Sequence, residues 1–182
     1  KLSSGVMIVS KYPLELIKHV VFDVSKKSDK GAQKGCSLVK ININNKAIFL
    51  AGTHLDSKNN NSRSLQYQIT NDEILKPYLT DSIPLLIAGD FNTDFKSSQY
   101  DSMMTSFKLK NFELNDDRPY TFDEFNTWNA KGYKAWIDFI FYQENKNIKV
   151  FNQYILRPVM KYKNAKMDLA DHYQIVIEAV IY

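Results

Sequence analysis

The segment Trp136-Ile137-Asp138-Phe139-Ile140-Phe141-Tyr142 is bulky and apolar at both its even and its odd positions, with one exception. Successive side chains of an extended strand point to opposite faces, so a strand with this pattern must be covered on both sides. The exception is Asp138, whose carboxylate is costly to bury without a partner. Histidine is a natural partner, because one ring nitrogen can donate to the carboxylate while the other remains free for chemistry. The segment therefore predicts a central strand that carries one paired charge.

Other short apolar segments, separated by polar turns, are typical of β-strands. The predicted strands span residues 6–9, 20–24, 37–43, 47–51, 84–88, 135–142, 149–156 and 173–181, with a tight turn at Asn44-Asn45 between the third and the fourth. Two stretches have helical character, residues 64–75 before Pro77 and residues 97–109. Many strands with few helices favour two packed sheets flanked by helices over an alternating βαβ fold. We therefore expect an α+β protein with two mainly antiparallel sheets.

Composition narrows the class of protein. The 182 residues suffice for one domain with a buried core, and 6 Gly with 5 Pro argue against extended disorder. The single Cys36 excludes an intramolecular disulfide framework and a cysteine-based zinc site. No apolar run approaches the roughly 20 residues that a membrane span needs. A net charge of +4 with three arginines is low for a dedicated nucleic-acid-binding module.

Three further segments place polar residues where the apolar pattern ends. One ends in Gly52-Thr53-His54, one continues into Gly89-Asp90-Phe91-Asn92, and Asp171-His172 precedes the last predicted strand. In an extended chain Asp90 and Asn92 point to the same side, while Phe91 turns toward the core. Each segment also has a purely structural interpretation, namely a surface histidine, an Asx turn and a structural Asp–His pair. The third histidine of the chain, His19, has no such setting, and we interpret it as structural.

Taken together and in this order, four fragments resemble the endonuclease/exonuclease/phosphatase superfamily. They are Gly52-Thr53-His54, Gly89-Asp90-Phe91-Asn92, Ile137-Asp138-Phe139-Ile140-Phe141 and Ala170-Asp171-His172. The family more often has Ser at the position of Ala170. The resemblance implies a four-layer α/β/β/α sandwich.

Within this superfamily the chain is most similar to the bacterial neutral sphingomyelinases, from residue 4 to its end. This similarity rests on Arg63 and Gln66, on Pro119-Tyr120-Thr121-Phe122-Asp123 followed by Asn126, and on Asp29 and Lys34. The family's metal-binding Glu lies on strands before the first residue of this chain. We therefore expect residues 1–182 to form a single catalytic domain that is incomplete at its N-terminus and that a preceding segment or another chain completes. The stretch that corresponds to the family's membrane-docking hairpin, residues 156–169, is short and rich in lysine.

The resemblance implies hydrolysis of a phosphodiester by in-line attack of water on phosphorus. Asp138 would orient His172, and His172 would take a proton from the water. Asn92 and His54 would bind the phosphoryl oxygens, and Asp90 would orient the water or lie near a metal. With sphingomyelin as the substrate, the products are ceramide and phosphocholine.

The resemblance further implies Mg²⁺ as the cofactor, because hard oxygen ligands suit this ion. Asp171 and Asp90 are expected on the metal side, while the family's main Glu ligand is absent from this chain. The residues expected to bind substrate are Asp29, Lys34, His54 and Asn92. The expected partner is sphingomyelin or a related phosphodiester lipid at a membrane surface, which would place the protein outside the cell or at that surface.

Two other functions remain open for this sequence: one uses the same catalytic residues, and the other involves no catalysis. A DNA or RNA endonuclease of the same superfamily would share the catalytic core and would bind polynucleotides with a steep salt dependence. The scarcity of arginine and the presence of the Asp29 and Lys34 pair make nucleic acid the less favoured partner. A non-catalytic relative that binds a membrane or a partner would lack Mg²⁺-dependent activity. It would more plausibly have lost Asp138 or His172, which are both present.

Overall fold

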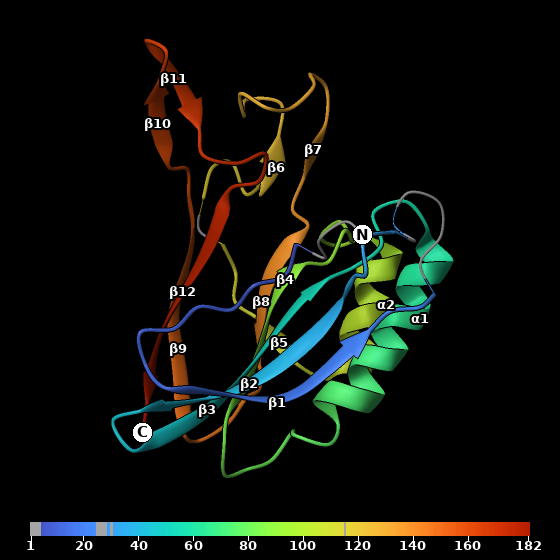
Figure 1. Ribbon diagram of the computed structural model, residues 1–182, viewed down its shortest axis with the longest axis vertical. Helices are drawn as coiled ribbons and strands as arrows, with labels where there is room; N and C mark the ends of the chain where they lie inside the picture. Colours follow the sequence, from blue (N-terminus) through green and yellow to red (C-terminus); the bar gives the residue numbers. More distant parts are fainter. Residues whose placement is uncertain (1–4, 25–28, 30, 115) are drawn as a thin grey trace.

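A six-stranded sheet forms the centre of the computed structural model, which describes residues 5–24, 29, 31–114 and 116–182 (Figure 1). The strands, in their order across the sheet, are β1 (Leu14–Val21), β2 (Gly35–Ile43), β3 (Lys46–His54), β4 (Leu85–Asp90), β8 (Asp138–Tyr142) and β5 (Lys110–Asn111). Only the β3–β4 pair is parallel among these. The predicted turn at Asn44-Asn45 joins β2 to β3, with φ of 49° and 67° at its two residues.

Helices cover one face of this sheet and a second sheet covers part of the other (Figure 1). The helices are α1 (Asn60–Thr70), the π-helix η2 (Asn71–Leu75) and α2 (Ser98–Phe107). The second sheet pairs β9 (Ile148–Leu156) with β12 (Gln174–Ile181), and β12 lies against β8. Two small hairpins pair β6 (Phe122–Asp123) with β7 (Lys134–Ala135), and β10 (Val159–Tyr162) with β11 (Ala165–Asp168). The predicted α+β class, with two packed and mainly antiparallel sheets and flanking helices, is confirmed.

Aromatic rings fill the core between the helices and the sheet. Phe91, directly after β4, is fully buried and has T-shaped contacts with Phe107, Phe139 and Phe141, at centroid distances of 6.3, 5.9 and 5.0 Å. Phe139 and Phe141 therefore turn to the helices, whereas Asp138 projects from β8 to the opposite face. The two-sided apolar pattern predicted a covered strand, and β8 indeed lies between β4 and β5 with the second sheet against it.

The N-terminal predictions need correction. Residues 6–9 form no strand; instead, Ile8 and Val6 cross the face of the sheet opposite to the helices, where a Cβ at Gly52 would lie 3.1 Å from Ile8 Cγ1. Of the predicted strand 20–24, only residues 20–21 lie in a strand, at the end of β1, which begins at Leu14 and ends at Val21. Charged residues interrupt the apolar pattern of β1, as is common for an edge strand with one exposed face. Residue 4, where the similarity to sphingomyelinases begins, lies outside the described residues.

Two other boundaries differ for local reasons. The predicted strand 135–142 is divided between β7 and β8, because the carbonyls of Trp136 and Ile137 turn to accept from Phe95 and Phe91. The first helix begins at Asn60 rather than at 64, because the Asn59 side chain caps it by accepting from the backbone of Ser62. In the described part of the chain, no helix is both long and apolar enough to cross a membrane.

Candidate active site

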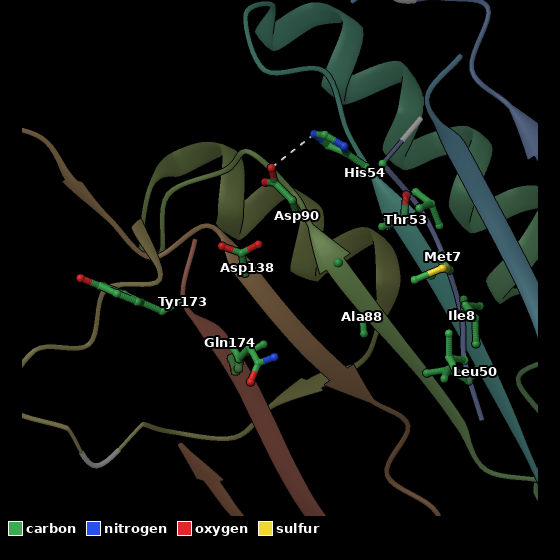
Figure 2. A pocket seen from close by; sticks show the side chains of 17 residues that line it. Met7, Ile8, Leu50, Thr53, His54, Ala88, Asp90, Asp138, Tyr173 and Gln174 are labelled. Carbon is green, nitrogen blue, oxygen red and sulfur yellow. Dashed lines mark ion pairs between the residues drawn. The ribbon is translucent and has the colours of Figure 1, made fainter. Parts of the chain in front are cut away.

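Three polar side chains stand in a row across three neighbouring strands. His54 at the end of β3 is the register partner of Asp90 at the end of β4, and Asp90 is the register partner of Asp138 at the start of β8. Directly paired residues project to the same face of a sheet, and here that face is the one opposite to the helices. Figure 2 shows the three side chains at the ends of adjacent strands. The pairing of β3, β4 and β8 thus brings together residues from three separate sequence motifs.

Close approach of β3 and β4 explains the glycine before Asp90. A Cβ at Gly89 would lie 1.9 Å from the backbone oxygen of Thr53, so a larger residue would push the two strands apart. The chain then turns sharply, with φ of 48° at Asn92, a conformation that asparagine tolerates better than most residues. This turn returns the Asn92 side chain to Asp90.

Asp138 and His172 form a hydrogen-bonded pair. His172 Nδ1 lies 2.8 Å from Asp138 Oδ2, and His172 itself comes from the segment that precedes β12. Burial lowers the pKa of His172, but the hydrogen bond and the negative charge of Asp138, together with the charges of Asp90 and Asp171, outweigh burial and raise the pKa to about 9. With Nδ1 occupied by Asp138, Nε2 is the nitrogen left for proton transfer.

Asp90 lies between the other polar groups of the site. Its carboxylate accepts from the backbone and the side-chain amide of Asn92, at 2.7 and 3.0 Å, and lies 3.3 Å from His54 Nε2. Burial, followed by the negative charge of Asp138, raises the pKa of Asp90 to about 7. Asn92 Nδ2 also donates to Leu55 O at 3.0 Å, so both of its amide protons have acceptors within the protein.

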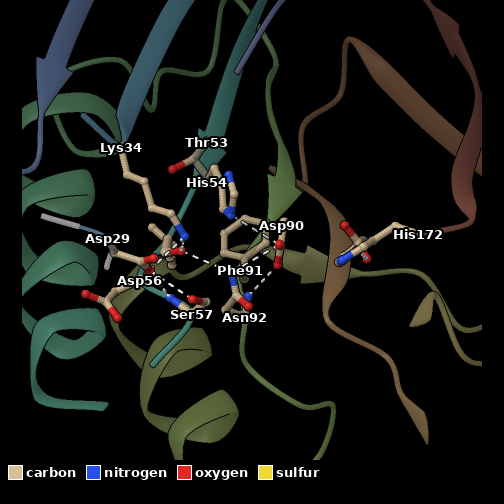
Figure 3. Close-up of polar contacts among 12 residues, drawn as sticks. Asp29, Lys34, Thr53, His54, Asp56, Ser57, Asp90, Phe91, Asn92 and His172 are labelled. Atoms are coloured by element: carbon tan, nitrogen blue, oxygen red, sulfur yellow. Dashed lines mark hydrogen bonds and ion pairs between the residues drawn. The ribbon is translucent and has the colours of Figure 1, made fainter. Parts of the chain in front are cut away.

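Asp29 and Lys34 form a buried ion pair at the edge of the site, with Lys34 Nζ 3.0 Å from Asp29 Oδ2 (Figure 3). Lys34 also donates to Leu55 O at 2.6 Å, and Asp29 accepts from the backbone and hydroxyl of Ser57. Burial raises the pKa of Asp29, but the bonds from Ser57 and Lys34 outweigh it and leave the pKa below its usual value. The pair thus fixes the loop after β3, and a direct contact with substrate remains a prediction.

These residues surround one open cleft of about 740 Å³. The predicted site residues that line it are Asp29, Lys34, His54, Asp90, Asn92, Asp171 and His172. In Figure 3, His172 faces Asp90 and Asn92 from across this space. Asp138 lines a neighbouring cavity of about 450 Å³, which it shares with His54 and Asp90. Hence the structure gathers every predicted site residue at one end of the sheet.

Two aromatic rings in the cleft were not predicted from the sequence. The Phe122 ring makes T-shaped contacts with His172 and Tyr133, with centroid distances of 5.0 and 5.5 Å, and Tyr133 is 54% exposed. Phe122 lies within the Tyr-Thr-Phe-Asp segment, from which the sequence predicts similarity to sphingomyelinases but no role in the site. Tyr133 lies in a polar stretch that offers no signal. The two rings meet because β6 pairs with β7.

Two carboxylates and one imidazole could hold a metal ion. Ligand atoms of Asp90, Asp138 and His172 all lie within 4.8 Å of one another. Burial, followed by repulsion from Asp138, raises the pKa of Asp90, and a bound cation would favour the charged carboxylate. The hard oxygen donors therefore fit a divalent ion such as Mg²⁺. Asp171 is exposed and lines the cleft outside this group, so its assignment to the metal remains a prediction.

Three other residues singled out in the sequence lie away from the cleft and have structural contacts. His19 lies on β1, with its Nδ1 2.9 Å from Ser37 Oγ. Arg63 Nη1 donates to Asp56 O at 2.9 Å, and Gln66 Oε1 accepts from Asp56 N at 2.8 Å. The last two bonds join α1 to the loop that follows β3, so they support the site only at a distance.

Comparison with known proteins gives matches over most of the chain. The profile of the endonuclease/exonuclease/phosphatase family matches residues 1–172. A sphingomyelinase C from Leptospira interrogans is 30% identical over 152 residues, which are 76% of this chain and 27% of that protein. These matches confirm the resemblance expected from the four sequence fragments.

The fold is similar to solved structures as well. Beta toxin from Staphylococcus aureus has a TM-score of 0.78 at 22% identity, covering 93% of this chain and 65% of that chain. A beta toxin structure with bound magnesium ions has a TM-score of 0.75 at 21% identity, covering 95% of this chain and 66% of that chain. The chain thus spans about a quarter of the curated relative's length and about two thirds of each solved chain.

Proposed function

The chain belongs to the endonuclease/exonuclease/phosphatase family, and from that premise we propose that its cleft hydrolyses a phosphodiester lipid. The observation that carries the proposal is the Asp138–His172 pair, which stands opposite Asp90 and Asn92 in a cleft open to solvent. An imidazole oriented by a carboxylate is suited to remove a proton from water. The attacking water would lie between His172 and the phosphorus.

Each remaining polar group has a task in this reaction. Asp138 holds the His172 ring and stabilises the imidazolium that forms when His172 takes the proton. His54 would donate to a phosphoryl oxygen, where negative charge accumulates. Because both amide protons of Asn92 have acceptors, Asn92 acts first by holding Asp90, and binding of a phosphoryl oxygen would require one of these bonds to exchange.

A divalent cation fits the carboxylate oxygens of this site. Asp90, with Asp138 or Asp171 beside it, would hold the ion, and we propose Mg²⁺. When bound, it supplies positive charge that stabilises the departing alkoxide. The solved beta toxin structure with magnesium ions supports this choice through its similar fold.

For the substrate, we propose sphingomyelin, which would be hydrolysed to ceramide and phosphocholine at a membrane surface outside the cell. Similarity to a sphingomyelinase C supports this choice. The cleft also suits a quaternary ammonium, because aromatic faces attract such cations and the carboxylates of Asp29, Asp90 and Asp171 line the same cleft. In phosphocholine one oxygen and two carbons separate phosphorus from nitrogen, so a phosphate beside His172 brings the ammonium within reach of Phe122 and Tyr133.

A substrate panel tests this function. The longest natural form of the protein would be incubated with vesicles of sphingomyelin or phosphatidylcholine and with plasmid DNA, each with Mg²⁺ or EDTA. We expect Mg²⁺-dependent release of phosphocholine from sphingomyelin, lost in His172→Ala and retained in His19→Ala, since His19 lies on β1 away from the cleft. Cleavage of plasmid with the lipid left intact would instead identify a nuclease, and no hydrolysis of any substrate would favour a non-catalytic relative.

A further inference from the structure

We propose that Thr121 is the positioning residue that fixes Asp138 and His172 relative to each other, an inference that rests on the proposed function. Thr121 is fully buried and lies directly before β6, outside both β8, which carries Asp138, and the segment before β12, which carries His172. Its hydroxyl oxygen accepts from the backbone N–H groups of Ile137 and Asp138, at 3.1 Å each. Thr121 therefore holds the backbone that carries the catalytic carboxylate.

The backbone of the same residue holds the segment that carries His172. Thr121 O accepts from Tyr173 N at 2.7 Å, directly after the histidine in the chain. Thr121 N donates to Ala135 O at 3.1 Å, at the end of β7. One residue thus forms four hydrogen bonds to two segments, one at residues 135–138 and one at residue 173, and these segments carry the two members of the Asp138–His172 pair.

Two asparagines near Thr121 in the sequence hold the backbone on the N-terminal side of His172. Asn126 Nδ2 donates to Ala170 O at 2.9 Å, and Asn129 Nδ2 donates to Asp171 O at 2.8 Å. These bonds limit movement of the backbone before His172, whereas Thr121 limits it after His172. Thr121 differs from both asparagines because its hydroxyl also reaches the Asp138 strand.

The proposed hydrolysis requires Asp138 and His172 to be held precisely in position. Misplacement of a catalytic group by about 1 Å can lower a rate by about 100-fold. Removal of the hydroxyl would leave two buried N–H groups without this acceptor, and the backbone would move to satisfy them. We therefore expect the loss to affect the chemical step rather than substrate binding.

Three variants test the proposal in the longest natural form of the protein. Thr121→Val keeps the branched shape and removes the acceptor, whereas Thr121→Ser keeps the acceptor. Thr127→Val is the control for loss of a threonine hydroxyl, because the hydroxyl of the exposed Thr127 also accepts from a backbone N–H, but from that of Asp168 rather than from residues 137 and 138. Phosphocholine release from sphingomyelin vesicles with Mg²⁺ gives kcat and KM. Backbone amide exchange at residues 137 and 138, and the low-field proton signal of His172 Nδ1–H, give readouts that need no activity.

For Thr121→Val, we expect kcat to fall about 10- to 100-fold with KM within about threefold. Exchange at residues 137 and 138 should be at least about tenfold faster, and the His172 signal should weaken or move. Thr121→Ser and Thr127→Val should remain within about threefold of the wild type in kcat, with unchanged signals. If Thr121→Val does not fold, Thr121→Ala compared with Thr121→Ser isolates the same hydroxyl.

Two results would overturn the proposal. One is wild-type kcat and unchanged exchange in Thr121→Val; the other is an equal loss in Thr121→Ser and Thr121→Val, which would indicate a role in packing. If the wild type hydrolyses no phosphodiester, the proposed function fails, while amide exchange and the His172 signal still decide whether Thr121 fixes the pair.

Discussion

Replacement of Asp138 by Asn keeps the size of the side chain but removes the negative charge beside His172. The Asp138 Oδ2 to His172 Nδ1 distance of 2.8 Å is that of a charge-assisted hydrogen bond. Such bonds are worth about 1.5–3 kcal/mol, which corresponds to about 10- to 150-fold in rate if the charge acts in the transition state. The same charge helps to raise the pKa of His172 to about 9, so its removal should move this pKa toward 6.5.

Two effects of Asp138→Asn can therefore be separated in a pH–rate profile. Hydrolysis of the soluble substrate p-nitrophenyl phosphocholine, followed across pH 6–10, avoids any effect of the membrane. The plateau of kcat at high pH should fall about 10- to 150-fold, because His172 is neutral there with or without Asp138. The acidic limb should move to lower pH, because the imidazolium is no longer stabilised. Asp101→Asn, an equal change of charge on the exposed face of α2, should change neither the plateau of kcat nor the position of the acidic limb.

A plateau within about threefold of the wild type, with an acidic limb at the same pH, would refute the role of Asp138. A lowered plateau with an unmoved limb would show that Asp138 supports the structure of the site without stabilising the imidazolium.

Three further outcomes are expected. Lys34→Met removes the ion-pair partner of the buried Asp29 carboxylate and should lower the free energy of unfolding in urea by about 3 kcal/mol. Lys58→Met, at an exposed lysine, should change this free energy by less than about 0.5 kcal/mol. Equal effects of the two substitutions would contradict the buried ion pair. The raised pKa of His172 means that the folded state binds its proton more tightly, so in EDTA the contribution of His172 to stability is complete below about pH 6.5 and is lost as pH rises through about 9. A Tm difference between the wild type and His172→Asn that does not vary over this range would contradict this assignment. Tyr133→Leu should lower kcat/KM for a choline lipid about 2- to 30-fold relative to kcat/KM for the ethanolamine lipid, whereas Tyr133→Phe should leave this ratio unchanged. If Tyr133→Leu lowers kcat/KM equally for both lipids, Tyr133 does not contact the quaternary ammonium.

The sequence predicted the fold class and which polar side chains lie close together, but it did not predict where every strand begins and ends. Asp138 interrupts an apolar strand, and the cost of a buried charge demanded the partner that the structure supplies in His172. Asp90 and Asn92 are two residues apart in an extended segment, so their proximity followed from strand geometry. Such rules are sufficient where a single strand or turn sets the arrangement, or where a buried charge requires a partner.

Other contacts between distant segments have no such signal in the sequence. Residues 6–9 have the composition of a strand, yet the structure places them across the face of β3 beside Gly52. In the sequence, Thr121 is a residue typical of β-strands and gives no sign of a special role. Its hydrogen bonds to residues 137, 138 and 173 join three segments that meet only in the folded chain. The contact of Phe122 with Tyr133 and His172 depends likewise on the pairing of β6 with β7 and on the path before β12.

Hydrolysis of sphingomyelin in ¹⁸O-labelled water tests the central claim most directly, because the account requires water to attack phosphorus with His172 as the base. Mass spectrometry of both products locates the oxygen that water contributes. We expect one ¹⁸O atom in phosphocholine and none in ceramide, with a rate that His172→Ala lowers by at least about 100-fold. Label in the ceramide hydroxyl, or labelled phosphocholine formed equally fast by His172→Ala, would contradict the account.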